Sequence, residues 1–448
     1  MRVIVVGAGE VGTYVADRLS RESHDVALIE SDPERVGQLE RELDVLVVQG
    51  DGTHPSTLKR AGIDSTDLLV AVTSVDSVNL VASMVGKQAG VARSVVRLES
   101  SELRARNPSS AAVREAVGAD LVIDPDEEVA QEVLGLLEYP GASEVAAMAD
   151  GEVTVIGARL PEDAPLVGRK LSEIAAEYEP NWDFLFGAIT RGNETIIPRG
   201  DQTLQAHDLV RVVAKRRARR ELAKLMGLAR TAPKRVMLLG GGRTAELLAQ
   251  RLPGRGEDVT IVERNPERAR VLAERLDALV LQGEVTDADL LLDADVGSFD
   301  AVIALTGEDD ANVLACLFAK QAGATETIAI LHRLALLGLL TEEGIDGALS
   351  PRTATANAVL RFVRGDVAQV ATFLHGQAEV VELIVSRGSP ADGSAIADLD
   401  LPHDVLVGAI VRDGKAQIGR GRSQLRARDH VIVFAEPEMV DRVRKVFG

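Results

Sequence analysis

Three glycines near the start of the chain have the spacing that binds the pyrophosphate of a dinucleotide. Residues 3–12 read VIVVGAGEVG, an apolar run that breaks into glycines before a helical pattern begins. Gly7 permits a tight turn, Gly9 has no Cβ and lets a pyrophosphate approach the backbone, and Gly12 allows the helix to pack closely on the strand. The free N–H groups at the start of that helix favour phosphate.

An acidic residue at the end of the next expected strand strengthens this interpretation. Glu30 lies 18 residues (30 − 12) beyond Gly12 and ends the stretch VALIE, where a carboxylate can accept both hydroxyls of a ribose. The same charge would repel a 2′-phosphate, which disfavours NADP. Within the loop, Ala8, Glu10 and Val11 complete the expected phosphate-binding segment.

Polar residues also follow three later strands of the same segment. Asp51 ends the third strand, where it either lines the adenine side of the pocket or caps the next helix. Thr73 and Ser74 end the fourth strand at the switch point, where open α/β sheets bind their ligands. Arg97 ends the fifth strand, and it either reaches a phosphate or forms a surface ion pair.

This pattern occurs twice along the chain. Residues 236–252 read VMLLGGGRTAELLAQRL, and Gly240 matches Gly7 at an offset of 233 residues (240 − 7). The same offset aligns four further pairs without a gap: Glu30 with Glu263, Gly50 with Gly283, Thr73 with Thr306, and Asn79 with Asn312. Self-similarity in constant register over about 80 residues indicates a duplicated unit.

The second copy keeps part of the expected ligand set and changes the rest. The turn glycines, the ribose carboxylate and the switch-point threonine are retained as Gly240, Gly242, Glu263 and Thr306. Four positions differ: Arg243 replaces Glu10, Ala245 replaces Gly12, Glu284 replaces Asp51, and Ile330 stands at the position of Arg97. We therefore expect two sites that differ in ligand preference or affinity, and the first is the better candidate for occupancy.

A second, smaller similarity follows each copy. Residues 185–214 resemble residues 406–435 at an offset of 221 (406 − 185). The offset aligns two notable pairs: Gly187 with Gly408, and Asp208 with Asp429. Both segments have the pattern of short alternating strands separated by Gly-Asn, Asp-Gly and Gly-Asp turns.

The order of elements predicts the fold class. Short β-branched strands alternate with amphipathic helical stretches in each large copy, which indicates a parallel sheet covered on both faces, with strand order 3-2-1-4-5 or longer. We expect an α/β chain with two tandem Rossmann-like doubly wound parallel sheets, each followed by a small α+β C-lobe. The expected domains are a first nucleotide-binding lobe (1–138), a first small lobe (139–216), a basic linker helix (217–233), a second nucleotide-binding lobe (234–367) and a second small lobe (368–448).

Composition excludes several classes of function. The net charge of −19 and the aromatic content of 3% disfavour nucleic acid as a partner. The single cysteine, Cys316, cannot form an intramolecular disulfide or a multi-thiolate metal site, and we expect it in a buried helix. The seven histidines show no metal-binding spacing. No apolar run approaches the ~18 residues of a membrane span, so we expect a cytoplasmic protein without direct membrane insertion.

Catalysis has little support in the sequence. Hydride transfer needs a substrate domain and an acid or base near the nicotinamide, and each large lobe is followed by only about 70–80 residues, roughly half of a common domain. No catalytic arrangement recurs in both copies, since His54 corresponds to Asp287. Nucleotide sensing is therefore favoured, and the alternative is a NAD-dependent oxidoreductase with a duplicated cofactor lobe.

These features together resemble a known family. The series GAGEVG, Glu30, QGDGT, AVTSVDSVN and Arg97, followed by LEYPGA and a small lobe with VGRKL, GAI and Gly-Asp turns, is similar to RCK (KTN) modules, which regulate potassium conductance. Two such modules in one chain resemble the TrkA-type regulatory subunits of Trk potassium-uptake systems. The resemblance covers essentially the whole chain, and the duplication together with the GDxT and TxxDxxN elements makes it specific.

The resemblance implies ligands and partners. Large lobes of this family bind NAD(H) or ATP and ADP as regulatory ligands, and the chains form a homo-oligomer, expected as a tetrameric ring, at the inner face of the cell membrane beneath a membrane-embedded potassium transporter of the Trk type. Carried over, the contacts of the first site are Gly7 to Val11, Glu30, Thr73, Ser74 and Arg97, and those of the second are Gly240, Gly242, Glu263 and Thr306. In the second small lobe the Gly-Asp turn at 200–201 becomes Gly421-Arg422, so a ligand site there would differ. Regulation of a potassium efflux system is a further alternative.

Overall fold

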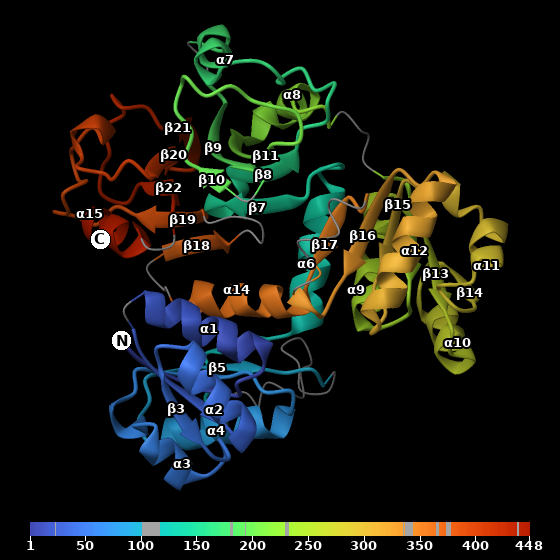
Figure 1. Cartoon of the computed structure of the whole chain (residues 1–448), viewed down its shortest axis with the longest axis horizontal. Coiled ribbons are helices and arrows are strands. Elements are labelled where there is room, and N and C mark those ends of the chain that lie inside the picture. The colour runs from blue at the N-terminus through green and yellow to red at the C-terminus, as the bar shows by residue number, and fades with distance from the viewer. Residues whose placement is uncertain are drawn as a thin grey trace. The chain divides into compact units, whose positions relative to one another are not determined.

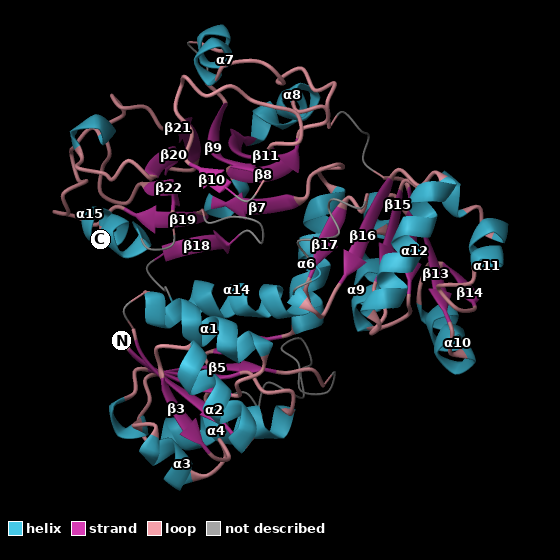
Figure 2. Cartoon of the chain, in the orientation of Figure 1, coloured by secondary structure: helices cyan, strands magenta, loops and turns pink. Residues whose placement is uncertain are grey.

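Two large α/β lobes alternate along the chain with two small lobes built on antiparallel sheets (Figures 1 and 2). The structure is a computed structural model that describes residues 1–22, 24–100, 117–179, 182–192, 194–228, 233–334, 336, 344–363, 367–372, 378–436 and 439–448. By its internal contacts the chain divides into two compact units, Met1–Val129 with Pro351–Gly365, and Ala130–Ser350 with Asp366–Gly448.

The first large lobe is a doubly wound parallel sheet with strand order β3-β2-β1-β4-β5-β6. Its strands are β1 Arg2–Val6, β2 Asp25–Glu30, β3 Leu46–Gln49, β4 Leu68–Ala71, β5 Arg93–Arg97 and β6 Leu121–Ile123. Its helices are α1 Glu10–Arg21, α2 Pro33–Glu42, α3 Pro55–Arg60 and α4 Asp76–Gln88, and α6 Pro125–Leu137 follows. The central strands β1 and β4 are almost fully buried, as their continuous apolar sequences predict.

The second large lobe repeats this topology with strand order β14-β13-β12-β15-β16-β17. Its strands are β12 Arg235–Leu239, β13 Asp258–Glu263, β14 Leu279–Gln282, β15 Ala301–Ala304, β16 Glu326–Ile330 and β17 Gly347–Leu349. Its helices are α9 Arg243–Arg251, α10 Pro266–Arg275, α11 Ala288–Asp293 and α12 Asp309–Ala322, and α14 Pro351–Val363 follows. The predicted fold class and duplication are confirmed.

Each small lobe is a five-stranded antiparallel sheet, with orders β10-β9-β11-β8-β7 and β18-β19-β22-β20-β21. The first contains β7 Glu144–Met148, β8 Val153–Arg159, α7 Leu171–Glu177, β9 Phe184–Arg191, β10 Glu194–Ile196, β11 Leu209–Lys215 and α8 Arg219–Leu225. The second contains β18 Val367–Thr372, β19 Glu379–Ile384, β20 Val405–Arg412, β21 Lys415–Ile418, β22 His430–Ala435 and α15 Val440–Phe447. Asn193 of the predicted Gly-Asn turn lies outside the described residues.

Helix α14 follows the second large lobe in sequence but packs on the first. It lies beside α1 (Figure 1). Its apolar residues Val359 and Leu360 are fully buried in one core with Val15 and Leu19 of α1. Arg361 of α14 also donates to the Glu128 carboxylate at 2.6 Å, at the start of α6. The first large lobe therefore takes part of its core from a helix more than 300 residues further along the chain.

The end of α6 belongs to the other compact unit, beside the second large lobe. Leu136 of α6 lies next to Gly347 of β17, so close that a Cβ on Gly347 would come within 3.5 Å of it. Just beyond the helix, the Gly141 N–H donates to Glu326 of β16 at 3.2 Å. Glu138 pairs with Arg255 at 3.0 Å.

The basic segment 217–233, predicted as a solvated linker helix, is shorter and more buried than expected. Helix α8 ends at Leu225, and its Leu222 is fully buried with Met226 in the core of the first small lobe. Residues 229–232 lie outside the described residues. The apolar side chains at helical spacing thus attach this helix to the small lobe. Of its arginines, Arg220 is exposed, whereas Arg219 lies over the Tyr139 ring and donates to Thr154 at 2.6 Å.

The two small lobes share one apolar core. Phe434 of β22 lies against Gly187 of β9, where a Cβ would come within 2.2 Å of the Phe434 ring. At the related position, a Cβ on Gly408 would lie 2.9 Å from Val213 of the first small lobe. The glycine of each GAI sequence is therefore needed where the opposite lobe packs against its strand.

The paired aspartates of the small lobes have a structural role. Asp208 and Asp429 are almost fully buried, with 1% of each residue exposed. Arg191 contacts Asp208 through two hydrogen bonds of 2.8 Å, and Arg412 contacts Asp429 at 2.7 and 2.6 Å. Each pair fixes the turn before the last strand of its sheet.

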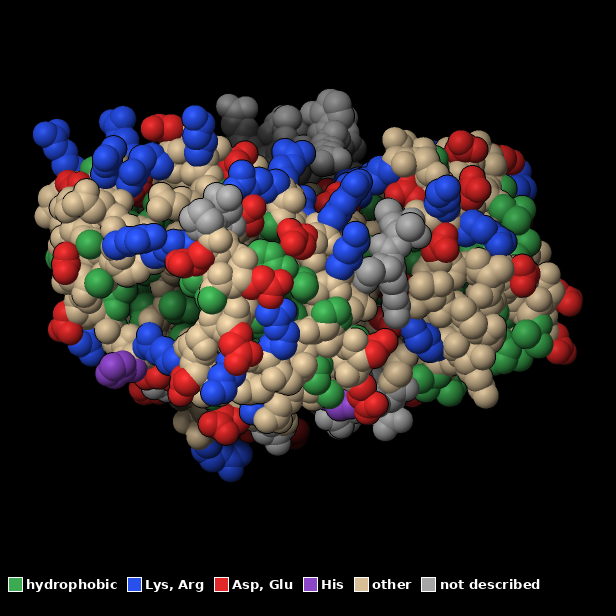
Figure 3. Space-filling model, turned by 90° about the horizontal axis from the view of Figure 1, so that it is seen from above, with side chains coloured by type: hydrophobic (Ala, Val, Ile, Leu, Met, Phe, Trp, Pro, Cys, Tyr) green, Lys and Arg blue, Asp and Glu red, His purple; other side chains and the backbone are tan. Residues whose placement is uncertain are grey.

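Cys316 is fully buried in α12, as predicted, and burial raises the pKa of its thiol to about 12. On the face drawn in Figure 3, acidic and basic side chains are interspersed. Among the residues that the structure describes, no helix combines the length and apolar character needed to span a bilayer.

Adding a methyl group at Gly187 should weaken the joint between the small lobes. We expect Gly187→Ala to lower the free energy of unfolding by about 1–3 kcal/mol, because the new Cβ overlaps the Phe434 ring. Urea unfolding measures this. The control is Gly37→Ala in α2, where a Cβ meets no atom within 4 Å and stability should not fall. Equal stability of Gly187→Ala and the unsubstituted chain would contradict the packing described.

Candidate nucleotide-binding site

The glycine loop between β1 and α1 has the geometry that the sequence predicts. Gly7 has φ +96°, in the left-handed region that favours glycine, and its N–H donates to the Ile29 carbonyl at 3.0 Å. A Cβ on Gly12 would lie 1.8 Å from the Gly7 carbonyl oxygen. These two glycines are therefore required by the fold itself, and the close packing predicted for Gly12 is confirmed.

Gly9 differs, because nothing in the protein requires it. It has ordinary extended backbone angles, and a Cβ there would meet no atom within 4 Å. It is the N-cap of α1, and no side chain caps this helix end. The first turn, with Glu10 and Val11, thus presents backbone N–H groups beside open space, which suits an anion.

Glu30 is held in place at the end of β2 by backbone N–H groups. Its Oε2 accepts from Ala8 of the glycine loop at 3.1 Å, and its Oε1 accepts from Ser31 at 2.6 Å and Asp32 at 2.9 Å. The two N–H groups occupy the lone pairs of Oε1, so the capacity left for a ribose hydroxyl is on Oε2. Asp32 itself caps α2, accepting from the Glu34 N–H at 2.9 Å.

A buried asparagine holds the switch point together. Asn79 of α4 is fully buried, and its Oδ1 accepts from the Thr73 N–H at 2.9 Å and from the Thr73 hydroxyl at 2.8 Å. Its Nδ2 donates to the carbonyls of Thr73 at 3.0 Å and Arg97 at 2.9 Å. Asn79 therefore joins the ends of β4 and β5. Ser74 is exposed at the same edge.

The aspartate of the TxxDxxN element completes this network. Asp76 accepts from the N–H groups of Glu99 at 2.9 Å and Ser100 at 2.7 Å. The sequence shows that this aspartate recurs as Asp309 in the second copy, but it does not indicate the role. Asp309 likewise accepts from the N–H groups of His332 and Arg333, both at 2.8 Å.

Asp51 stabilises a turn and does not cap the following helix. Its Oδ1 accepts from the Thr53 N–H at 2.8 Å and hydroxyl at 2.7 Å, and these bonds hold the pKa of Asp51 below its usual value. The N-cap residue of α3 is His54, which has no side-chain cap. The capping role weighed for Asp51 is therefore wrong, and a contact with adenine stays a prediction.

Arg97 forms the ion pair that was the alternative to a phosphate contact. Its guanidinium pairs with Glu99, and 18% of its side chain is exposed. Its Nε is buried and has no hydrogen-bond partner among the described residues. A contact with phosphate stays a prediction.

Arg352 reaches the glycine loop from the start of α14 and forms an ion pair with Glu10. Both residues lie in the same compact unit. The sequence gave no indication of this contact, because the two residues are 342 positions apart (352 − 10). The carboxylate closest to the expected phosphates is thus partly neutralised by a cation from the helix that follows the second large lobe.

The second copy repeats the hydrogen bonds that hold the loop and the switch point, but the side chains around its site differ. The Gly241 N–H donates to Glu263 Oε2 at 2.7 Å, and Asn312 bonds Thr306 as Asn79 bonds Thr73. Gly240 has φ +108°, and Gly242 is the N-cap of α9. The first residue of α9 is Arg243.

Two peripheral positions of the second copy differ from those of the first. Ile330 is buried and apolar, and Glu284 is exposed. Arg333, three residues beyond Ile330, pairs with Asp309 at 3.2 Å and with Asp310. Arg97 is likewise paired with a carboxylate, Glu99, so substitution of Arg333 for Arg97 at a ligand stays a prediction.

Comparison with known proteins assigns the family. The model of the TrkA-N domain matches residues 3–125 and 236–351, and that of the TrkA-C domain matches residues 155–227 and 380–448. The chain belongs to the TrkA family. Its four matched segments coincide with the two large and two small lobes described above, so the TrkA-N and TrkA-C order occurs twice.

Curated TrkA relatives match over nearly their whole length. The Trk system potassium uptake protein TrkA of Halomonas elongata is 35% identical over 441 residues, covering 97% of this chain and 95% of the relative. That of Azorhizobium caulinodans is 34% identical over 452 residues, covering 100% and 98%. The TrkA homolog 2 of Methanosarcina mazei is 35% identical over 454 residues, covering all of both chains.

Solved structures with the same fold include RCK domains. The crystal structure of the GsuK RCK domain has a TM-score of 0.59 to this TrkA-family chain at 16% identity, covering 99% of this chain and 94% of that one. The GsuK channel bound to NAD has a TM-score of 0.59 at 16% identity, covering 99% and 78%. At this identity the likeness concerns the fold alone.

Two glycines of the loop should respond differently to the same substitution. Gly12→Ala should lower the free energy of unfolding by about 1–3 kcal/mol or more, because its Cβ overlaps the Gly7 carbonyl oxygen. Gly9→Ala should cost about 1 kcal/mol or less, the difference between glycine and alanine at an N-cap, and should weaken nucleotide binding. Urea unfolding and nucleotide titration of both variants measure the contrast. Loss of stability in Gly9→Ala with unchanged binding would contradict this assignment.

Proposed function

We propose that this chain is a cytoplasmic, nucleotide-sensing regulatory subunit that gates a membrane potassium-uptake transporter of the Trk type. The observation that carries the proposal is the glycine loop, where Gly9 leaves open space at an uncapped helix end beside the fixed carboxylate of Glu30. Membership of the TrkA family and the names of its relatives support the transport role.

The proposed ligands are NAD(H) and the adenine nucleotides ATP and ADP. All of them present a ribose with two free hydroxyls, for which Glu30 retains acceptor capacity, and a phosphate group for the start of α1. The GsuK channel, which shares the fold, is described as bound to NAD, and this supports the same ligand class here. The first site, with Arg97 and the Glu10–Arg352 pair, is proposed as the more selective of the two.

The proposed mechanism is a shift between two arrangements of the chain. A ligand changes such an equilibrium only by its differential affinity for the two states, and moving a gate from mostly closed to mostly open takes about 5 kcal/mol. Several ligand sites in a homo-oligomeric ring can together supply this free energy. Helix α14 is proposed to take part, because its Arg352 pairs with Glu10 at the first site and the next described strand along the sequence, β18, belongs to the second small lobe.

Catalysis is not part of the proposal. Three polar side chains of the first lobe bond backbone N–H groups: Glu30 accepts from Ala8 of the glycine loop, Asp76 from Glu99, and Asn79 from Thr73. A NAD-dependent oxidoreductase is the alternative of another class, and a regulator of potassium efflux is the alternative within the same class.

Nucleotides should stabilise the purified chain against thermal unfolding. A ligand at about 100 times its dissociation constant adds about 2.7 kcal/mol, which is visible as a rise in Tm. We expect stabilisation by ATP, ADP, NAD or NADH and little by NADP, because the Glu30 carboxylate repels a 2′-phosphate. Glu30→Gln should reduce the rise more than the matched variant Glu263→Gln, since the first site is the more complete.

Two further measurements on the same purified chain separate the alternative functions. Exchange of the stabilising nucleotide should change the small-angle scattering of the assembly, and an unchanged profile would contradict gating by conformational change. Stabilisation by NAD and NADH alone, together with NADH oxidation in the presence of small carbonyl compounds, would favour the oxidoreductase.

Arg352 should contribute to nucleotide affinity although it lies on α14. Arg352→Gln removes the cation beside Glu10 and leaves that carboxylate close to the ligand phosphates, so we expect about tenfold weaker binding, with a larger loss for ATP than for NAD. Isothermal titration measures the change. Glu10→Gln in the same chain should restore most of the affinity, because it removes the repelling charge.

The matched control for Arg352 is Arg361, on the same helix. Arg361 pairs with Glu128 at 2.6 Å, and no hydrogen bond or ion pair joins it to the described residues of the glycine loop. Arg361→Gln should therefore leave nucleotide affinity unchanged. Equal loss of affinity in both variants would mean that disturbance of α14, and not the charge beside Glu10, is responsible.

A further inference from the structure

An ion pair bridges the crevice of the second nucleotide site. Arg264 directly follows β13, and Glu308 lies two residues beyond the switch-point Thr306, which follows β15. Their charged groups are 3.1 Å apart. In the sheet, β12 lies between β13 and β15, and the glycine loop follows β12. The pair therefore spans the carboxyl edge of the sheet across the end of β12, where open α/β sheets bind their ligands.

The two corresponding positions of the first site cannot form such a pair. At the offset of 233 residues, Arg264 corresponds to Ser31 and Glu308 to Val75. The backbone is nevertheless the same, because Val75 and Glu308 are each the N-cap of their helix, with φ and ψ of −119° and 107° in one and −116° and 102° in the other. Neither side chain caps its helix. The fold therefore does not require a carboxylate at position 308.

Two further ion pairs hold the walls of the second crevice. Arg268 of α10 contacts Glu246 of α9 at 2.9 Å, and it donates to the Gly241 carbonyl of the glycine loop at 2.8 Å. Arg333, beyond β16, pairs with Asp309 at the start of α12 at 3.2 Å. The bridge between Arg264 and Glu308 thus joins two walls that are themselves fixed.

The first copy does not repeat these two pairs either. Arg268 corresponds to Arg35, which is exposed and has no hydrogen bond or ion pair with a residue that the structure describes. Arg333 corresponds to Ser100, which carries no charge. The three arginine–carboxylate pairs are therefore a property of the second copy, and only the pair of Arg264 with Glu308 crosses from one side of the crevice to the other.

We propose that the Arg264–Glu308 pair is a latch: it closes the crevice of the second site, and a nucleotide must separate the two side chains to enter. The inference rests on the proposed nucleotide sensing and adds a regulation of one of its two sites. Both side chains are exposed, and an exposed ion pair stabilises by a small amount that falls as salt screens it. The latch should therefore lower the affinity of the second site about two- to fivefold at low ionic strength.

The salt dependence gives the latch a regulatory meaning. As ionic strength rises, the pair weakens, and the affinity of the second site should rise relative to that of the first. The ratio of occupied second sites to occupied first sites would then report the salt content around the protein, which is a suitable signal for a chain that is proposed to control potassium uptake.

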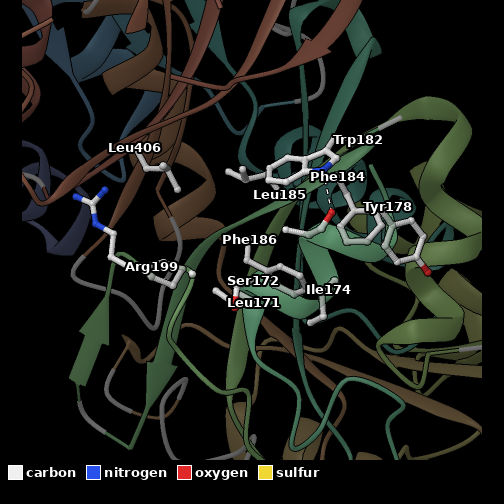
Figure 4. A pocket seen from close by; sticks show the side chains of 13 residues that line it. Leu171, Ser172, Ile174, Tyr178, Trp182, Phe184, Leu185, Phe186, Arg199 and Leu406 are labelled. Atoms are coloured by element: carbon white, nitrogen blue, oxygen red, sulfur yellow. Dashed lines mark hydrogen bonds between the residues drawn. The ribbon is translucent and has the colours of Figure 1, made fainter. Parts of the chain in front are cut away.

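A cavity in the small lobes has a different chemistry. Its volume is about 250 Å³, and Figure 4 shows Trp182 and Phe184 on one side of it and Arg199 and Leu406 on the other. None of the described residues that line it is acidic, so it offers no carboxylate to the hydroxyls of a ribose. Dependence on Glu263 therefore distinguishes nucleotide binding in the second crevice from binding in this cavity.

The test is calorimetric titration of the full chain with ATP and with NAD, in a Glu30→Gln background that weakens the first site. The double variant Arg264→Ser/Glu308→Val gives the second crevice the residues of the first and leaves the net charge unchanged. Affinity for both nucleotides should rise about two- to fivefold at about 0.05 M KCl. The gain should disappear at about 1 M KCl, where the Debye length is about 3 Å.

A reciprocal variant and a matched control accompany this test. Ser31→Arg/Val75→Glu, in the chain with Glu30 intact, should lower the affinity of the first site by a similar factor. Arg270→Gln/Glu274→Gln removes an exposed ion pair of the same length, 3.1 Å, that runs along α10 and does not cross the crevice. This control should leave the affinity of the second site unchanged.

Three outcomes would overturn the latch although nucleotide still binds. Unchanged affinity in Arg264→Ser/Glu308→Val would mean that the pair does not oppose binding. A fall in affinity would mean that one of the two side chains contacts the ligand. A gain that persists at about 1 M KCl would mean that the shape of the side chains, and not their charge, is responsible. Absence of any binding that depends on Glu263 would instead contradict the proposed function of the second site, on which the latch rests.

Discussion

Gly12 of helix α1 lies so close to the Gly7 carbonyl oxygen that a Cβ would come within 1.8 Å of it. This close approach fixes where α1 begins over the end of β1, and the rest of the first site is arranged around that point. Glu30 bonds the loop from one side through the Ala8 N–H, and Thr73 lies against Gly7 on the other. The second copy has an alanine, Ala245, at the corresponding position. Its helix α9 therefore accommodates a Cβ where α1 has no room for one.

The sequence predicted those parts of the structure that depend on local pattern and on repetition. Continuous apolar strands between amphipathic helices indicated the doubly wound sheets, and Glu30 lies where the glycine spacing placed it. The contact of Arg352 with Glu10 could not be predicted, because no local pattern encodes which helix covers α1. The burial of Leu222 was missed for a related reason: its basic neighbours suggested a solvated helix, while the small lobe supplied an apolar surface. Asp51 had two plausible local roles, and the turn at Thr53 provided a third.

Duplication followed by divergence explains the differences between the two halves of the chain. The elements that hold each sheet together are nearly identical, as the Asn79 and Asn312 networks and the Asp208 and Asp429 pairs show. The positions that face solvent at the sites have changed charge, for instance from Glu10 to Arg243 and from Asp201 to Arg422. The framework has therefore been kept, while the surfaces that are proposed to meet ligands now differ in charge.

The position of α14 also affects the order in which the chain can fold during synthesis. The outer face of α1, with Val15 and Leu19, is covered by residues that reach as far as Val363. At a synthesis rate of about 5–20 residues per second, the 342 residues between Arg21 and Val363 (363 − 21) take about 20 to 70 s to produce. During that time the first lobe has its sheet but lacks one wall of its core. The lobe that is synthesised first is thus completed only after the second large lobe has left the ribosome.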